Sequence, residues 1–158
     1  MRVGLISCGK EKLDHAAPAQ DLYIGSYFKL CKQWITKRTG PHTRCDEWAI
    51  LSAKYGLVMP DQVIEPYDLA LSDLPRLKKE RWEDWVLEQL MDKWGEQVIY
   101  MVLMGQDYRW VVKKNMPMVE DVIECWTQWR RDKGMTNRRA AMSIGLIKKA
   151  LKEDQGYY

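Results

Sequence analysis

Three short, almost wholly apolar segments alternate with stretches of helical spacing, and this alternation constrains the fold more than any other feature of the sequence. The apolar segments are Arg2–Ile6, Trp48–Leu51 and Gln97–Met104. Strands that are apolar throughout are typical of a parallel sheet that is covered on both faces. The sequence therefore predicts a three-layer α/β fold, with a mainly parallel central sheet and helices on both faces.

Between and after these strands, apolar residues recur every three or four positions, as in amphipathic helices. We expect helices over Ser26–Thr36 and Ser72–Trp94, with Ser72 as a cap, and a short helix that follows Gly105–Tyr108 and runs to about Asn115. Weaker patterns favour two further helices, over Pro117–Arg131 and Thr136–Lys152.

The chain has 158 residues, which is enough for one domain with a substantial core, and it contains no linker or repeat. We therefore predict a single α/β domain over residues 1–158. The net charge of +3 comes from 25 basic and 22 acidic residues, which alone does not indicate nucleic acid. The bases gather in 29–44 and 130–152 and the acids in 80–96 and 120–124. A basic nucleic-acid-binding face and an ordinary solvated surface are both compatible with this distribution.

The four cysteines, Cys8, Cys31, Cys45 and Cys125, are widely spaced, and no pair has the spacing of zinc ligands. The sequence shows no secretory signal and no apolar run long enough to cross a bilayer. These observations favour a cytoplasmic protein with reduced thiols, away from the membrane. We expect neither a metal nor a cofactor, and the sequence does not indicate an oligomeric state.

A polar loop follows each of the three predicted strands: Ser7–Lys10, Ser52–Tyr55 and Gly105–Tyr108. If the strands are parallel, all three loops open at the carboxyl edge of the sheet, where ligands bind in α/β folds. Glycines in or beside these loops would let a ligand approach the backbone closely. Those glycines are Gly9, Gly56 and Gly105. The polar side chains expected in the resulting crevice are Lys10, Lys12, Lys54, Glu65, Tyr67, Asp68, Gln106 and Tyr108.

Each of these residues also has a simpler interpretation. Ser7 and Ser52 can cap the turns that follow them, and Gly105 can be an ordinary turn glycine. Tyr67 and Tyr108 can be aromatic residues at the edge of the core with hydroxyls in water. Because three such loops meet at one edge of the predicted sheet, we favour the functional interpretation.

Several motifs resemble a small bacterial and phage family that is known mainly as a domain of unknown function. They are Ser7–Lys10, Pro18–Tyr23, Ser26–Phe28, Ile50–Gly56, Ile64–Asp68 and Gly105–Tyr108. Members of that family are often labelled as transglycosylase-like. Their layout is similar to the uracil-DNA glycosylase superfamily, in which strand-end loops hold a flipped base. An anti-phage DNA glycosylase that removes glucosylated hydroxymethylcytosine is also similar in size and motif.

The resemblance implies a DNA glycosylase-like hydrolase that acts on a modified base in DNA. The superfamily carries an Asp or Asn near a Pro-Tyr in the loop after its first strand. Here that loop is Ser7–Lys10, and the Pro-Tyr is Pro66-Tyr67. Catalytic roles therefore have to be assigned from local chemistry, because they do not transfer by position.

Cleavage of an N-glycosidic bond builds positive charge on the sugar and negative charge on the departing base. A carboxylate suits the sugar, and we favour Asp68 over Glu65 because Asp68 lies between an aromatic residue and an apolar run. Hydrogen-bond donors suit the base, and Lys54 is the third catalytic candidate. Candidates for holding the base by stacking, donors or close backbone approach are Ser52, Tyr67, Gly105, Gln106, Tyr108, Tyr23, Cys8 and Gly9.

Phosphate groups of DNA have two candidate sites. Lys10 and Lys12 follow the first strand, and a predicted helix begins near Thr136, where free N–H groups favour an anion. A plain capped surface helix explains the second site equally well. The residues of this helix start are Thr136, Asn137, Arg138 and Arg139.

Three other functions remain open. A base-transferring enzyme would use the same crevice with a second substrate, and a non-catalytic module would only bind nucleotide or nucleic acid. A metal-dependent nuclease is less favoured, because the carboxylates lack obvious ligand spacing and His15 and His42 each stand alone.

Overall fold

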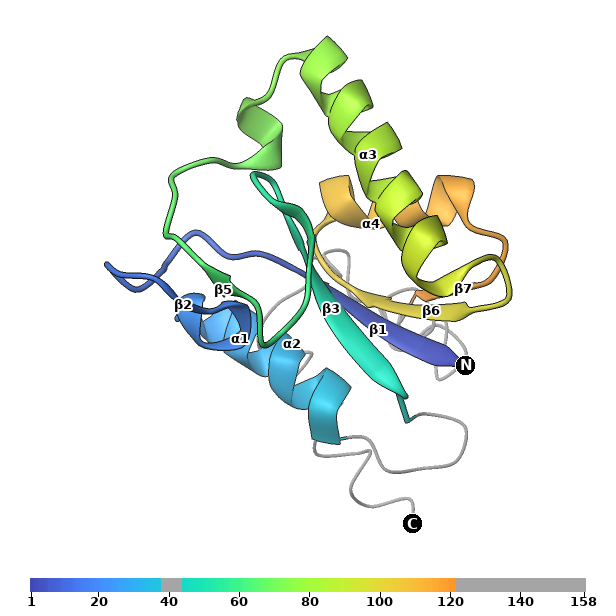
Figure 1. The fold of residues 1–158 in the computed structure, drawn as a ribbon, viewed down its shortest axis with the longest axis horizontal. Coiled ribbons are helices and arrows are strands. Elements are labelled where there is room, and N and C mark those ends of the chain that lie inside the picture. Colours follow the sequence, from blue (N-terminus) through green and yellow to red (C-terminus); the bar gives the residue numbers. More distant parts are fainter. Residues whose placement is uncertain (38–43, 122–158) are drawn as a thin grey trace, which may run out of the picture.

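The computed structural model describes residues 1–37 and 44–121, and these contain a five-stranded sheet in the order β4-β3-β1-β6-β7 (Figure 1). The four strands β3, β1, β6 and β7 are parallel, and β4 runs antiparallel to β3. The expected mainly parallel sheet is thus confirmed. The strands are β1 (Arg2–Ser7), β3 (Glu47–Ser52), β4 (Gly56–Val58), β6 (Ile99–Leu103) and β7 (Val119–Asp121).

The register of the central strands brings their carboxyl ends together. Ser7 of β1 pairs with Leu51 of β3, and Ile6 of β1 pairs with Leu103 of β6. The loops after β1, β3 and β6 therefore start side by side, as the sequence predicted.

Helices cover both faces of the sheet (Figure 1). On one face, α2 (Ser26–Lys37) buries Trp34 and Ile35 in a cluster with Ile6 and Ile50 of the sheet. On the other face, α3 (Arg76–Trp94) and α4 (Gln106–Asn115) pack on Val3, Leu5 and Val102. The three-layer arrangement is confirmed.

A small antiparallel ribbon joins two loops that are far apart in the sequence. It consists of β2 (Ala17–Pro18) and β5 (Val63–Ile64), and α1 (Ala19–Leu22) follows β2 directly. The chain then passes through the 3-10 turn η1 (Leu71–Asp73) before α3. The ribbon holds the loop after β1 against the loop after β4 near the carboxyl edge of the sheet (Figure 1).

Three predicted boundaries were wrong. Gln106 and Tyr108, expected in a loop, lie in the first turn of α4. Residues 119–121, expected in a helix over Pro117–Arg131, form strand β7, and the remainder of that helix lies outside the described residues. Ser72 lies in η1, and α3 begins only at Arg76, directly after Pro75. Proline is favoured at a helix start because its missing N–H has no intrahelical acceptor there.

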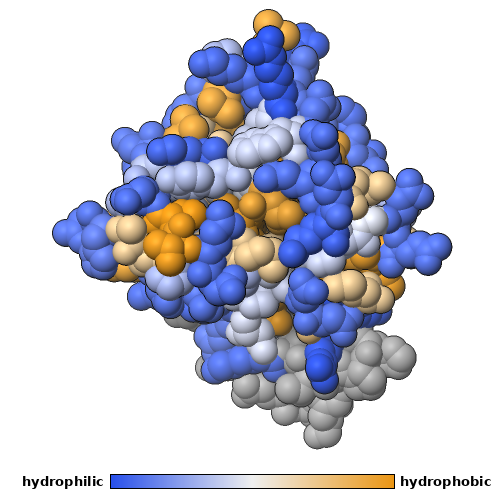
Figure 2. Space-filling model, viewed as in Figure 1, coloured by the Kyte–Doolittle hydropathy of each residue, from blue (hydrophilic) through white to orange (hydrophobic). Residues whose placement is uncertain are grey.

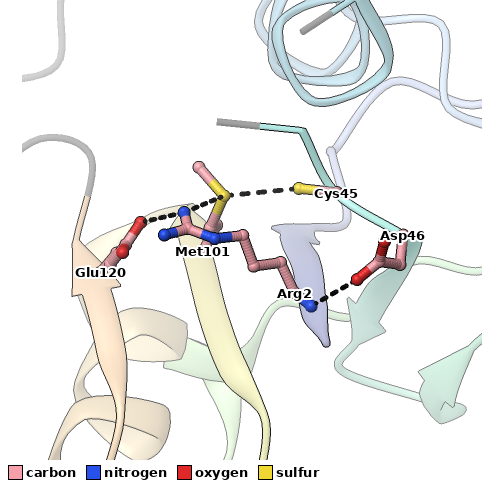
Figure 3. Close-up of polar contacts among 5 residues, drawn as sticks. All are labelled: Arg2, Cys45, Asp46, Met101 and Glu120. Carbon is pink, nitrogen blue, oxygen red and sulfur yellow. Dashed lines mark hydrogen bonds and ion pairs between the residues drawn. The ribbon is translucent and has the colours of Figure 1, made fainter. Parts of the chain in front are cut away.

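The amino-terminal end of β1 is fixed by polar contacts with its neighbours (Figure 3). The backbone N–H of Arg2 donates to Asp46 Oδ2 over 2.7 Å, and its guanidinium pairs with Glu120 at 2.9 Å. The thiol of Cys45 lies 3.6 Å from the sulfur of Met101. These contacts join β1, β6, β7 and the segment before β3 into one rigid edge.

Among the helices of residues 1–37 and 44–121, none combines the length and apolar character of a membrane span. The face drawn in Figure 2 carries its hydrophobic residues as separate patches among hydrophilic ones.

Candidate active site

Ser52, the last residue of β3, is fully buried and lies at the centre of a hydrogen-bond network. Its Oγ accepts from the backbone N–H groups of Lys54 at 3.2 Å and Tyr55 at 3.1 Å, which is the turn-capping role. The same Oγ lies 2.6 Å from the hydroxyl of Tyr67. A serine oxygen has two acceptor lone pairs, and the two N–H groups occupy both. Ser52 therefore donates its own hydrogen to Tyr67.

Tyr67 extends the network to Tyr23, and the two hydroxyls are 2.7 Å apart. Burial raises the pKa of Tyr23 to about 12, and burial together with the nearby Cys8 raises the pKa of Tyr67 as well. Both phenols therefore keep their protons at neutral pH and can act as donors. The ring of Tyr55 stands perpendicular to that of Tyr67, with centroids 5.5 Å apart.

Lys12 places an ammonium group against these rings. Its Nζ lies 4.3 Å from the centroid of Tyr67 and 5.8 Å from that of Tyr23, both within the range of cation–π attraction. Burial lowers the pKa of Lys12, while electrostatic interactions with Cys8 and with the exposed carboxylate of Asp68 oppose this change. The structure thus brings Asp68 within electrostatic range of an ammonium group. Lys12, expected at a phosphate, lies among the aromatic residues.

The thiol of Cys8 connects β1 to the first turn of α4. Its Sγ lies 3.2 Å from the hydroxyl of Tyr108, and its backbone N–H donates to Leu51 across the strands at 2.9 Å. Burial raises the pKa of Tyr108, so this third phenol also stays protonated. We call the group that converges here the strand-end cluster. Its members are Cys8, Lys12, Tyr23, Ser52, Tyr67, Asp68 and Tyr108.

Trp82 of α3 contacts two members of this cluster. The sequence did not identify it as a site residue. Its indole N–H donates to the carbonyl of Ser52 over 2.9 Å, and its ring packs edge-on against Tyr108, with centroids 5.5 Å apart. The residue is 5% exposed, so its helical spacing marked it only as core. A buried indole N–H needs a hydrogen-bond partner, and this requirement is the signal from which a second role of Trp82 could have been predicted.

Three predicted residues lie at the rim of the cluster, with exposed side chains. Glu65 takes part through its carbonyl, which accepts from Tyr55 over 3.3 Å. The carbonyl of Lys10 accepts from Lys12 over 3.2 Å. The ammonium of Lys54 lies 5.2 Å from the ring centroid of Tyr55. The four residues Thr136, Asn137, Arg138 and Arg139 lie outside the described residues.

The glycines differ in what they do. Gly105 faces open space, and its N–H lies 3.4 Å from the hydroxyl of Ser7. A side chain at Gly9 would make only ordinary contact with Phe28. Gly56 has a φ of +69° and is covered by Gln89. Its role is to allow the backbone turn of the β3–β4 hairpin. The expectation that Gly56 opens the backbone to a ligand was wrong.

Gln106 lines a separate hollow between α3 and α4, with a volume of about 230 Å³. The indole of Trp110, which is 63% exposed, forms part of the same hollow. Gln106 and Tyr108 are thus close in sequence, but Gln106 contributes to the hollow and Tyr108 to the strand-end cluster.

The sequence is similar to a bacterial protein and matches the model of a protein family. The chain is 33% identical over 69 residues to the uncharacterized protein YfjM of Bacillus subtilis (strain 168), a match that covers 40% of this chain and 42% of that protein. The chain therefore spans less than half the length of this relative. No solved structure matches significantly. Residues 3–130 match the model of a family of unknown function, DUF6884, so the chain belongs to that family.

Proposed function

We propose that this protein is a DNA glycosylase-like hydrolase that cleaves the N-glycosidic bond of a modified nucleobase. Glucosylated hydroxymethylcytosine in phage DNA is the modification we favour, and defence against phage is the corresponding role. The observation that carries the proposal is the strand-end cluster, where protonated phenols and the Lys12 ammonium lie together and the exposed carboxylate of Asp68 interacts electrostatically with Lys12. The resemblance of the layout, a parallel sheet with polar loops after its strands, to the uracil-DNA glycosylase superfamily supports the same choice.

The cluster contains a carboxylate for the sugar side of the scissile bond and hydrogen-bond donors for the base side. When the bond breaks, its electron pair leaves with the base, and the sugar carbon becomes cationic. The carboxylate of Asp68 stabilises that cation, orients the water that adds to it and accepts the proton that the water loses, while the departing base anion takes up a proton from solvent. The base receives hydrogen bonds from neutral phenols, because the raised pKa values of Tyr67 and Tyr108 keep those donors protonated.

Aromatic surface is the second requirement of this reaction, because the base must leave the stack of the duplex. Extrusion costs a few kcal/mol, and stacking on protein rings offsets part of it. Tyr55, Tyr67 and Tyr108 lie on three different segments around the cluster, and each is only partly buried. Their rings are the surfaces on which we expect the extruded base to stack.

The test is base release by the purified protein without added metal. Plain, hydroxymethylated and glucosylated phage DNAs are incubated with the protein, treated with alkali and run on a denaturing gel. Alkali-labile sites on a modified DNA, with water as the only co-substrate, support hydrolysis. Absence of such sites on every DNA would refute the proposal. A transferase would instead join an added free base to the DNA in place of the modified base and leave no abasic site.

A further inference from the structure

The hollow between α3 and α4 is lined by polar and aromatic groups that the reaction above does not use. Trp110, at 63% exposure, presents a large aromatic surface to solvent, and Leu71 and Val111 complete the apolar lining. The polar groups in the lining are an amide, an ammonium and two carboxylates. They belong to Gln106, Lys79, Glu83 and Asp107.

This hollow adjoins the strand-end cluster. Trp82 lines the hollow and also packs edge-on against Tyr108, whose hydroxyl contacts Cys8. Gln106 and Asp107 precede Tyr108 in the first turn of α4. Trp82 therefore belongs both to the lining of the hollow and to the surroundings of the cluster.

The charges at the hollow favour a base over a phosphate. The carboxylate of Glu83 is held by the amide of Asn115 at 3.0 Å and by the ammonium of Lys114 at 3.7 Å. Asp107 is exposed in the first turn of α4, where it repels anions but accepts hydrogen bonds from amino groups. A carboxylate suits the amino group of cytosine, and an amide such as that of Gln106 suits adenine.

We propose that this hollow binds the nucleobase next to the target base, by stacking on Trp110 and by hydrogen bonds to Asp107 and Gln106. The choice of a nucleobase as the ligand rests on the proposed function. Stacking of a base on an aromatic side chain changes affinity by roughly 5- to 100-fold. The carboxylate makes the hollow prefer a base with an exocyclic amino group over thymine.

The test measures binding without any cleavage, by fluorescence anisotropy of labelled single-stranded hexanucleotides of dC, dA or dT. Trp110→Ala should weaken binding of the dC hexamer by about 5- to 100-fold. Trp85→Ala, which removes another exposed tryptophan outside this hollow, should leave it unchanged. Asp107→Asn should reduce the preference for dC over dT. Circular dichroism confirms that each variant is folded.

Equal affinity of Trp110→Ala and the unaltered protein would overturn the inference, as would a preference for dC over dT that stays unchanged in Asp107→Asn. A Trp110 indole N–H resonance that shifts with glucose but not with the dC hexamer would identify a sugar site and also overturn it. Since the hexamers contain no modified base, these outcomes do not depend on base release. A protein that binds them through Trp110 but releases no base would refute only the proposed function.

Discussion

The coupling between Ser52 and Tyr67 gives a quantitative test of the network on which the site depends. Ser52→Ala removes a buried oxygen that accepts two backbone N–H groups and donates to Tyr67 at 2.6 Å. Each such bond contributes about 1 kcal/mol net, and a buried group left unpaired costs about 1–3 kcal/mol. We therefore expect Ser52→Ala to lower the free energy of unfolding by about 2–4 kcal/mol.

Tyr67→Phe keeps the ring that Lys12 contacts and removes only the hydroxyl, with its bonds to Ser52 and Tyr23. Two bonds at about 1 kcal/mol each predict a loss of about 1–3 kcal/mol. The two substitutions share one bond, so the double variant should be more stable than the sum of the single losses by roughly 1 kcal/mol.

The assay is urea unfolding of the unaltered protein, both single variants and the double variant at pH 7. A matched control pairs Ser52→Ala with Tyr100→Phe. Within the described residues, the buried hydroxyl of Tyr100 has no hydrogen-bond partner, so the changes that these two substitutions make in the free energy of unfolding should simply add. Additivity within about 0.3 kcal/mol for the Ser52–Tyr67 pair would refute the network.

Three further predictions concern the pKa of Lys12, the pKa of Tyr23 and the conformation of two glycines. The pKa of Lys12 is lowered by burial, so its charge is lost at a lower pH than that of exposed lysines. The rate of base release should therefore decline with rising pH before exposed lysines titrate. An unchanged dependence of this rate on pH in Lys12→Met would contradict this role. Because burial raises the pKa of Tyr23 to about 12, its contribution to stability is complete below pH 10 and is lost as the pH rises toward 12, by about 3 kcal/mol. Urea midpoints between pH 9 and 12 should fall less steeply in Tyr23→Phe, and an identical slope would exclude this linkage. Gly56 and Gly95 both have positive φ, but only at Gly56 would a side chain meet Gln89. Gly95→Ala should cost about 1–3 kcal/mol for its backbone conformation, and Gly56→Ala should cost clearly more, so equal losses would contradict the packing of α3 on the hairpin.

The central strands and the edge that carries the site were predictable because they depend on long, regular signals. Apolar runs identified β1, β3 and β6, and parallel pairing alone places the loops after them at one edge. Ser52 was identified as a turn cap and as a site residue, and its contacts support the cap directly.

The partners within the cluster were not predictable in the same way. The β2–β5 ribbon helps to hold Tyr23 beside Tyr67, and two-residue strands are too short to show a periodic pattern. Trp82 has the spacing of a core residue, so only its indole N–H bond to Ser52 shows its second role. The short strand β7 was mistaken for part of a helix. The spacing of apolar residues does not distinguish a three-residue strand from three residues of a helix.

The most direct test of the central claim compares the rate of abasic-site formation for three forms of the protein on glucosylated phage DNA. The account predicts base release by the unaltered protein and a loss of about 100-fold or more in Asp68→Asn. Asp61→Asn changes another exposed carboxylate of the same polar stretch and should release the base at the normal rate. Equal rates for all three forms, or no base release by any of them, would contradict an N-glycosidase centred on Asp68.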